Sequence, residues 1–365
     1  MNILHIIQTN QYRGVEIFTR NLAGWQIEQG HSVDVVTVYS AGNQKQLEFP
    51  GSSVYSLDAS GSLFDYKAFK KLNSIITRKP YDIVQANSGD TFRYSVFSKW
   101  LFKWKPPIIF RNSSVMGDYL KNALLKKYFY SVLRKACAGV ASVSEKSKMD
   151  FLETFPKYDG IIETIPVGID LDLLPDLKTG SSGDRFQIVH VGGFSFEKNH
   201  FGLIRIFNEV RKRLPQAELH LLGDGKLRDK IEGFVQSFNL QDAVIFHGYV
   251  ANPLDYIANA DLLVLPSIIE GLPSVILEAF ALKIPVIAYN VGGIPELVKD
   301  GITGRLINKG DEVAFAETIL KTFATPDNDL TLAAQVMVKT HFNKDIIVDL
   351  FDAFYRKVYE KSPPN

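Results

Sequence analysis

The stretch DLLVLPSIIEGLPSVILEAFALKIPVIAYNVGGIPELV, residues 261–298, decides the fold. It opens with an apolar run at 261–267, passes through a glycine- and proline-containing loop, and continues with apolar residues at helical spacing over about 274–282. A second apolar run follows at 285–289. Two short apolar runs joined through one helix are typical of neighbouring parallel strands in an α/β sheet.

The same alternation of strand and helix patterns extends in both directions. The expected strands are 3–8, 33–39, 82–87, 107–110, 138–144, 186–193, 217–223 and 243–250, and the expected helices are about 15–29, 200–213 and 226–238. The alternation pauses at 168–184, where Pro175 and the run Gly180–Gly183 are typical of a linker. We therefore predict an α/β protein with two domains, 1–175 and 185–340, each built on a parallel sheet.

The last stretch, 341–365, carries apolar residues at helical spacing: Ile347, Leu350, Phe351, Phe354 and Val358. A terminal helix with such a stripe has to bury it against a domain. In open parallel sheets, ligands bind outside the carboxyl ends of the strands, so the loops at those ends are the candidate sites.

The loop after the strand at 261–267 has the features of an anion site. Ser274 is expected to cap the following helix, whose first N–H groups and positive dipole end suit a diphosphate. Gly271 allows close approach of the backbone. Glu270 and Glu278 flank the site, and their carboxylates suit sugar and ribose hydroxyls. Two solvated glutamates on an ordinary strand–loop–helix unit would give the same short pattern.

The longer run EGLPSVILEAFALKIPVIAYNVGGIPE, 270–296, resembles the signature of glycosyltransferase family 4. The resemblance implies the GT-B fold: two Rossmann-like domains whose parallel sheets face each other across a cleft, with a C-terminal helix returning to the first domain. It implies that Glu270 contacts the donor sugar and Glu278 the ribose. The backbone N–H groups of Leu272, Ser274 and Val275 would hold the phosphates. Gly271 and Pro273 also belong to this expected donor site.

The segment VGGFSFEKNH, 191–200, follows a strand and opens a helix. Lys198 is expected to stabilise the leaving phosphate, and with Glu270 it forms our catalytic pair. Gly193 and Asn199 belong to the expected donor site, but Gly193 stands where the family has an arginine. The segment FHGYV, 246–250, lies where the family places a loop against the nucleobase, and Tyr249 and Val250 are expected to meet it.

The N-terminal loop 10–23 resembles the family's glycine-rich first loop, with Gly14 expected to present its amide to the donor. Arg13 replaces a family glycine and would supply the cation missing at position 193. Under this hypothesis Arg13→Ala raises the KM for the donor, and an unchanged KM rejects it. A solvated loop arginine is an equally good interpretation.

The family often has histidines after the strands that end near 84 and 110. This chain has QANSG and RNSS there, so Asn87, Arg111 and Asn112, together with Arg13, are the polar groups expected to meet the acceptor. The loss of both histidines weakens any mechanism with a histidine base in this domain.

The composition limits the remaining possibilities. With 46% hydrophobic and 22% charged residues the chain is a folded globular protein, and a single cysteine, Cys137, suits a reducing compartment. No His, Cys or Asp cluster has metal-ligand spacing, so neither metal nor cofactor is expected. Met1 leads directly into ILHII, without a basic segment before it, and no apolar run is long enough to span a bilayer. We expect a cytoplasmic protein.

Residues 91–150 hold 12 Lys and Arg against 3 Asp and Glu, although the whole chain has a net charge of +1. Within 99–135, lysines alternate with Trp, Leu, Phe and Tyr, which favours docking on an anionic membrane surface at the inner face of the cell membrane. Helices that bury their apolar side and solvate their lysines remain an alternative. Nucleic-acid binding is not expected, because no recognition motif accompanies the charge.

The sequence thus predicts a retaining, metal-independent hexosyltransferase that moves a sugar from a UDP- or GDP-sugar to a glycan or lipid-linked acceptor in bacterial surface polysaccharide synthesis. Two alternatives stay open. A nucleotide-sugar epimerase of the same fold would need no acceptor, and a non-catalytic subunit would bind sugar nucleotides without turnover.

Overall fold

The computed structural model describes residues 1–42, 46–117, 124, 131, 134–175 and 185–362. The chain divides into two compact units. The first joins Met1–Val167 to Lys344–Asn365, and the second is Gly168–Asn343. Each unit is built on one parallel sheet, as the sequence predicted, and each is described by itself below.

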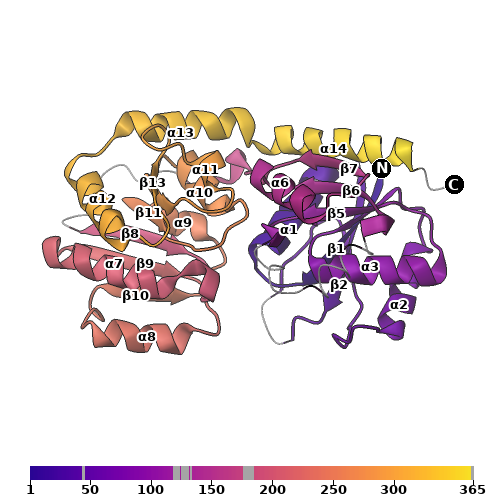
Figure 1. The fold of residues 1–365 in the computed structure, drawn as a ribbon, viewed down its shortest axis with the longest axis horizontal. Helices are drawn as coiled ribbons and strands as arrows, with labels where there is room; N and C mark the ends of the chain where they lie inside the picture. Colours follow the sequence, from indigo (N-terminus) through magenta and orange to yellow (C-terminus); the bar gives the residue numbers. More distant parts are fainter. Residues whose placement is uncertain (43–45, 118–123, 125–130, 132–133, 176–184, 363–365) are drawn as a thin grey trace. The chain divides into compact units, whose positions relative to one another are not determined.

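The sheet of the first unit has seven strands in the order β3-β2-β1-β4-β5-β6-β7 (Figure 1). Its strands are β1 (Asn2–Thr9), β2 (Ser32–Tyr39), β3 (Ser53–Ser56), β4 (Ile83–Ala86), β5 (Ile108–Asn112), β6 (Cys137–Ser142) and β7 (Ile161–Thr164). Its helices are α1 (Gly14–Glu28), α2 (Tyr66–Ile76), α3 (Gly89–Phe102), α6 (Glu145–Thr154) and α14 (Lys344–Lys361).

The sheet of the second unit has six strands in the order β10-β9-β8-β11-β12-β13. Its strands are β8 (Phe186–Val191), β9 (Ala217–Leu222), β10 (Val244–Gly248), β11 (Leu262–Leu265), β12 (Val286–Tyr289) and β13 (Arg305–Ile307). Its helices are α7 (His200–Arg213), α8 (Arg228–Ser237), α9 (Pro253–Ile257), α10 (Ser274–Ala281), α11 (Ile294–Leu297), α12 (Glu312–Ala324) and α13 (Asn328–His341).

The central strands are apolar almost throughout, because both faces of a parallel sheet are covered. The three strands that the sequence analysis did not predict, β3, β7 and β13, lie at sheet edges. They are short, and none of their residues is buried. A half-solvated edge strand leaves no apolar run to detect, which is why these segments were missed.

The C-terminal helix α14 packs against α1 and β7 of the first unit. It buries Phe351, Phe354 and Val358, whereas Leu350 of the predicted stripe is exposed. Gly139 in β6 makes room for it, because a Cβ atom there would lie 2.7 Å from Val358 and 2.8 Å from Phe354. The hydroxyl of Tyr355 donates to Oε1 of Gln85 on β4 at 2.6 Å, so the helix is also fixed by a buried polar contact.

Each sheet contains one point at which the order of the strands reverses. It lies between β1 and β4 in the first unit and between β8 and β11 in the second. Loops that leave such neighbouring strands run in opposite directions and open a crevice between them, which is where ligands of open α/β sheets bind.

Candidate functional site

In the second unit, the loops at the carboxyl edge of the sheet are tied together by their main chains. The Ile268 N–H donates to the Glu197 carbonyl at 2.8 Å, and the Gly293 N–H donates to the Gly271 carbonyl at 2.8 Å. A further bond of 2.9 Å joins the Phe194 N–H to the Asp224 carbonyl. The loops after β8, β9, β11 and β12 therefore form one platform, without relying on side-chain contacts.

Two glycines make this platform possible. Gly292 has φ of +55°, and a Cβ atom on it would lie 1.9 Å from the Glu270 carbonyl oxygen. Gly223 has φ of +138°, and a Cβ atom there would lie 2.1 Å from the Gly192 carbonyl oxygen. Only glycine fits at either position, because the backbone is left-handed and the neighbouring main chain leaves no space. Gly292 thereby allows the loop that carries Glu270 to lie directly against the loop after β12.

Lys198 and Glu270 meet at the reversal between β8 and β11. Nζ of Lys198 lies 2.6 Å from Oε1 of Glu270, which is only 9% exposed. Both residues are predicted site residues, but the sequence does not reveal their ion pair. In the low-dielectric surroundings of a buried carboxylate the attraction is stronger than at the surface. The pair places a cation next to an anion. The ammonium group of Lys198 is suited to bind a phosphate, and the carboxylate of Glu270 is suited to accept from hydroxyl groups.

The helix α10 begins at Ser274, directly after this loop. The predicted N-cap at Ser274 is wrong: Pro273 occupies the N-cap position and supplies no capping side chain. Ser274 and Val275 are the first residues of the helix, whose N–H groups have no carbonyl one turn earlier to bond. With no side chain capping them, they are open to an anionic ligand.

Glu278, one turn further along α10, is half-buried. Burial raises the pKa of its carboxyl to about 7, and a hydrogen bond with Ser274 partly opposes this rise. The fold therefore keeps a carboxyl group close to the start of α10 at an energetic cost. Groups with pKa values moved towards neutrality by burial are frequent at functional sites.

Two buried histidines lie beneath Lys198. The rings of His190 and His200 are 4.9 Å apart, edge to face. Burial is the main cause that lowers the pKa of His190 to about 4, and the charge of Lys198 contributes to this shift. His190 Nε2 lies 3.2 Å from the position that a Cβ atom on Gly192 would take. His190 is a core residue, and because it stays neutral at pH 7 it adds no charge next to Lys198.

The remaining predicted donor residues have different surroundings. Gly193 is exposed, and a Cβ atom on it would meet only the Asp224 carbonyl, at 3.6 Å. Asn199 caps α7, since its side chain accepts from the Gly202 N–H and donates to the Pro266 carbonyl, which gives it a structural role. Tyr249 is exposed and Val250 is half-buried in the loop after β10.

In the first unit, Gly14 opens α1 and is exposed, as is Arg13, the N-cap residue. The side chain of Arg13 makes no capping hydrogen bond. Glu16, in the same first turn, is buried, and this burial raises the pKa of its carboxyl to about 7. The start of α1 is therefore accessible, and the role expected for Arg13 stays a prediction.

The other three residues expected to meet the acceptor are buried. Asn87 donates to the Ile6 carbonyl at 3.2 Å, and Asn112 donates to the Ser147 carbonyl at 3.0 Å. The guanidinium of Arg111 donates to the carbonyls of Ile165 and Pro166. It also lies between the rings of Phe18 and Phe351, at 5.1 Å from each. These contacts correct the expectation, because they assign all three side chains to holding the first unit together.

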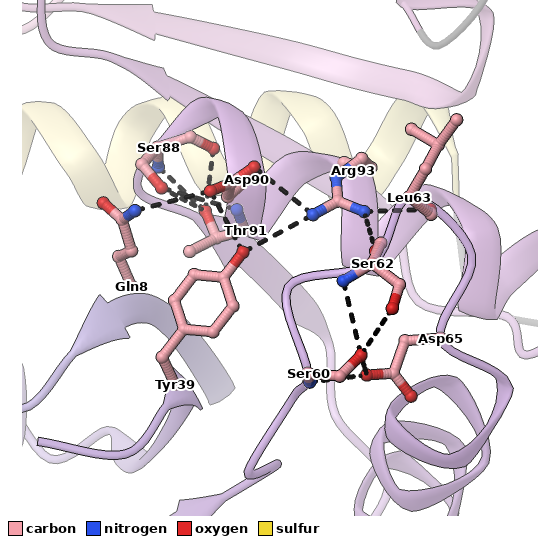
Figure 2. Close-up of polar contacts among 10 residues, drawn as sticks. All are labelled: Gln8, Tyr39, Ser60, Ser62, Leu63, Asp65, Ser88, Asp90, Thr91 and Arg93. Atoms are coloured by element: carbon pink, nitrogen blue, oxygen red, sulfur yellow. Dashed lines mark hydrogen bonds and ion pairs between the residues drawn. The ribbon is translucent and has the colours of Figure 1, made fainter. Parts of the chain in front are cut away.

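A different group of polar residues lies at the strand reversal of the first unit, and the sequence analysis missed it (Figure 2). The Asp90 carboxylate, in the first turn of α3, accepts from the hydroxyl of Tyr39 at 3.1 Å and from Gln8 Nε2 at 3.4 Å. Arg93 of the next turn lies 3.4 Å from it. Asp90 is 38% exposed, so it remains open to a ligand. The available signal was a carboxylate in the first turn of the helix after the strand at 82–87.

Two Asp-x-Asp triplets occur in the chain, at 170–172 and 327–329. Asp170 accepts from the Asp172 N–H at 3.0 Å, and Asp327 caps α13 and pairs with Arg305 at 3.3 Å. Both triplets lie at helix starts. Across the described ranges, no three His, Cys, Asp or Glu side chains are grouped so that they could hold a metal ion.

The basic segment 99–135 is only partly described, since 118–123, 125–130 and 132–133 lie outside the described residues. Nζ of Lys99 donates to the carbonyls of Lys105 and Pro106 and lies 4.8 Å from the centre of the Trp104 ring. Lys99 and Trp104 thus close the end of α3, and the membrane contact expected for the segment stays a prediction. No helix in the described part of the chain is both long and apolar enough to cross a bilayer.

Comparison with known proteins finds glycosyltransferase relatives for both parts of the chain. The model of Glycosyltransferase Family 4 matches residues 12–173, and the model of glycosyl transferases group 1 matches residues 177–335. The capsular polysaccharide biosynthesis glycosyltransferase CapM of Staphylococcus aureus is 29% identical over 356 residues, which cover 91% of this chain and 92% of the relative. An uncharacterized glycosyltransferase of Methanocaldococcus jannaschii is 29% identical over 182 residues. That match covers 47% of this chain and 44% of the relative, so it spans less than half of the relative's length.

Among solved structures, Anabaena HepE in complex with UDP-glucose superposes with a TM-score of 0.81 at 20% identity. The match covers 98% of this chain and 100% of that chain. The fold and family predicted from the sequence are thereby confirmed: the chain belongs to glycosyltransferase family 4, is a glycosyltransferase related to an enzyme of bacterial polysaccharide synthesis, and has the two parallel-sheet units of the GT-B fold.

Proposed function

We propose that this enzyme transfers a hexose-type sugar, with retention of configuration, from a UDP- or GDP-sugar to a glycan or lipid-linked acceptor. The observation that carries the proposal is the uncapped start of α10 between Glu270 and Glu278, with Lys198 paired to Glu270 at 2.6 Å. Anionic, diol and sugar groups of a nucleotide sugar each find a partner of suitable chemistry there.

The donor diphosphate binds at the first N–H groups of α10, where the helix dipole favours negative charge. Glu278 accepts hydrogen bonds from the ribose diol. Glu270 accepts from hydroxyls of the sugar. The UDP-glucose bound to HepE supports a uridine nucleotide as the first to test.

In the reaction, the acceptor oxygen forms a bond to the anomeric carbon while the bond from that carbon to the donor phosphate breaks. The acceptor proton passes to an oxygen of the leaving phosphate, on the same face of the sugar. Lys198 stabilises the negative charge that develops on this phosphate, and the α10 amides do the same without needing to reorganise. We propose that these groups of the chain, with no metal cofactor, meet the phosphate charge.

Asp90 is our candidate for a residue that positions the acceptor. Its carboxylate is fixed by Tyr39 and Arg93 and remains more than a third exposed. An oriented, accessible carboxylate accepts hydrogen bonds from sugar hydroxyls, which suits a glycan acceptor.

The test is a thermal-shift panel of nucleoside diphosphates, followed by turnover of the stabilising donor. A ligand that binds only the folded state raises the melting temperature. Lys198→Met is expected to lower kcat by about 10²–10³, the scale of losing one transition-state donor. The matched control is Lys309→Met, at an exposed lysine far along the sequence, after β13.

Two results would overturn the proposal. The first is that no nucleoside diphosphate stabilises the wild type, and the second is that Lys198→Met retains full turnover. Incubation of donor without acceptor separates transfer from epimerisation, because an epimerase converts the donor alone. The anomeric configuration of the product, measured by NMR, tests retention directly.

A further inference from the structure

Large apolar side chains are exposed together where α2 begins and α3 ends. They are Leu63, Phe64, Tyr66, Trp100 and Leu101, which we call the apolar edge. Leu63 is 66% and Phe64 60% exposed. Exposed apolar side chains scattered one by one need no explanation, but a contiguous group marks an interaction surface.

Ring contacts join the three aromatic residues of the apolar edge to half-buried neighbours. The ring of Phe64 lies 6.2 Å from that of Phe97, which in turn lies 5.7 Å from the ring of Trp100. The ring of Tyr66 lies 6.0 Å from that of Phe102, so the start of α2 is beside the end of α3. Phe64, Tyr66 and Trp100 therefore extend the apolar packing of the first unit outwards, and Leu63 and Leu101 are next to Phe64 and Trp100 in the chain.

The loop that carries Leu63 and Phe64 is firmly held (Figure 2). The guanidinium of Arg93, a buried residue of α3, donates to the carbonyls of Ser62 at 2.8 Å and Leu63 at 2.9 Å. Asp65 closes the loop by accepting from the Ser60 N–H at 2.7 Å. A loop held in this way presents its apolar tip without losing further conformational freedom when a partner binds.

Lysines surround this layer. Lys67 and Lys70 lie on α2, and Lys103 and Lys105 follow α3. All four are exposed, and within the described ranges none of their ammonium groups makes a hydrogen bond or an ion pair. Aromatic and aliphatic side chains bordered by unpaired lysines match a membrane surface, where acyl chains lie beneath anionic headgroups.

We propose that the apolar edge, with Lys67, Lys70, Lys103 and Lys105, docks this enzyme on an anionic lipid bilayer. The inference rests on the proposed function in one respect: a lipid-linked acceptor has its polar end at such a surface. It keeps residues 100–105 of the predicted segment 99–135 and adds residues 63–70. Soluble acidic proteins are the alternative partner, and they would not favour insertion of Phe64 and Trp100 into acyl chains.

The tryptophans provide a direct readout. Of the three in the chain, Trp25 is 4% and Trp104 6% exposed, whereas Trp100 is 37% exposed. In co-sedimentation with vesicles, the full-length protein is expected to bind phosphatidylglycerol–phosphatidylcholine mixtures and not phosphatidylcholine alone. On binding, the fluorescence of Trp100 shifts to the blue and is quenched by brominated acyl chains, and Trp100→Phe removes this response.

Variants test both parts of the surface. Phe64→Ser is expected to lower the partition coefficient at least tenfold, and Lys67→Gln with Lys70→Gln to lower it on the order of fivefold per lysine. Val313→Ser and Lys309→Gln, at exposed positions of the second unit, are the controls and leave binding unchanged. Circular dichroism and the melting temperature establish that each variant is folded.

The proposal is overturned if anionic vesicles do not retain the wild type, if Phe64→Ser binds as well as wild type, or if lipid does not reach Trp100. Binding without bromolipid quenching would indicate a purely electrostatic contact and would also reject it. Nucleotide binding is measured separately by thermal shift. A loss of vesicle binding with intact nucleotide binding therefore rejects the docking surface and leaves the proposed function standing.

Discussion

Replacing Glu278 by glutamine is expected to stabilise the protein while weakening its hold on the donor. Burial raises the pKa of this carboxyl to about 7 from a reference value of 4.5. Its ionised form is therefore less favourable in the folded chain than in the unfolded one. A residue that lowers stability at neutral pH and lies beside an uncapped helix start is expected to serve ligand binding.

The size of the effect follows from the shift. A difference of about 2.5 pKa units corresponds to about 3 kcal/mol, which is an upper limit because Glu278 is only half-buried. The sign is set by the raised pKa. The cost is absent below pH 4.5, grows as the pH rises towards 7, and is constant above that value. Glu278→Gln does not titrate and escapes this cost.

Two assays measure the two sides of this prediction. Above pH 7 the melting temperature of Glu278→Gln is expected to exceed that of wild type by several degrees, at about 2–4 °C per kcal/mol. In calorimetry, the variant is expected to bind the nucleotide about 10- to 100-fold more weakly, the value of hydrogen bonds to a charged group. For wild type, affinity rises between pH 6 and pH 8 as the carboxylate ionises, by about tenfold more than for the variant.

The variant also provides the control, because the phosphates of the nucleotide titrate in both proteins and only the difference reports on Glu278. The reasoning is refuted if Glu278→Gln melts below wild type at pH 8. It is equally refuted if the variant binds the nucleotide as tightly as wild type with the same pH profile.

Three further substitutions test other parts of the molecule. Gly292→Ala places a side chain 1.9 Å from the Glu270 carbonyl oxygen at φ of +55°. It should lower both the melting temperature and, by more than tenfold, kcat/KM. The control Gly310→Ala, which has open space around it, should lower only the melting temperature. Gly193→Arg restores the cation typical of the family at an open position and is expected to lower the KM for the donor several-fold; a higher KM would show that the position does not face the phosphates. Asp90→Asn is expected to raise the KM for the acceptor about tenfold without changing nucleotide affinity, and steady-state kinetics with each substrate varied in turn would reveal any effect on the donor instead.

The sequence by itself determined the order of the elements and the chemistry of one site. Strands buried on both faces leave continuous apolar runs, so the central strands and their helices could be predicted from pattern alone. The residues around 270–278 are close together in the chain, and so a local motif was enough to place the start of α10 between two glutamates.

Only the tertiary structure decided which polar side chains are free. Asn87, Arg111 and Asn112 follow or end strands just as ligand-binding residues do, but packing of α14 and of the neighbouring loops buries them, and they bond to the backbone. Asp90 was overlooked because its partners Gln8 and Tyr39 are more than 50 residues away in the chain. Only the pairing of strands in the sheet brings them next to it. The pairing of Lys198 with Glu270 is likewise a product of strand order, since 72 residues separate them and only the neighbouring positions of β8 and β11 bring them together.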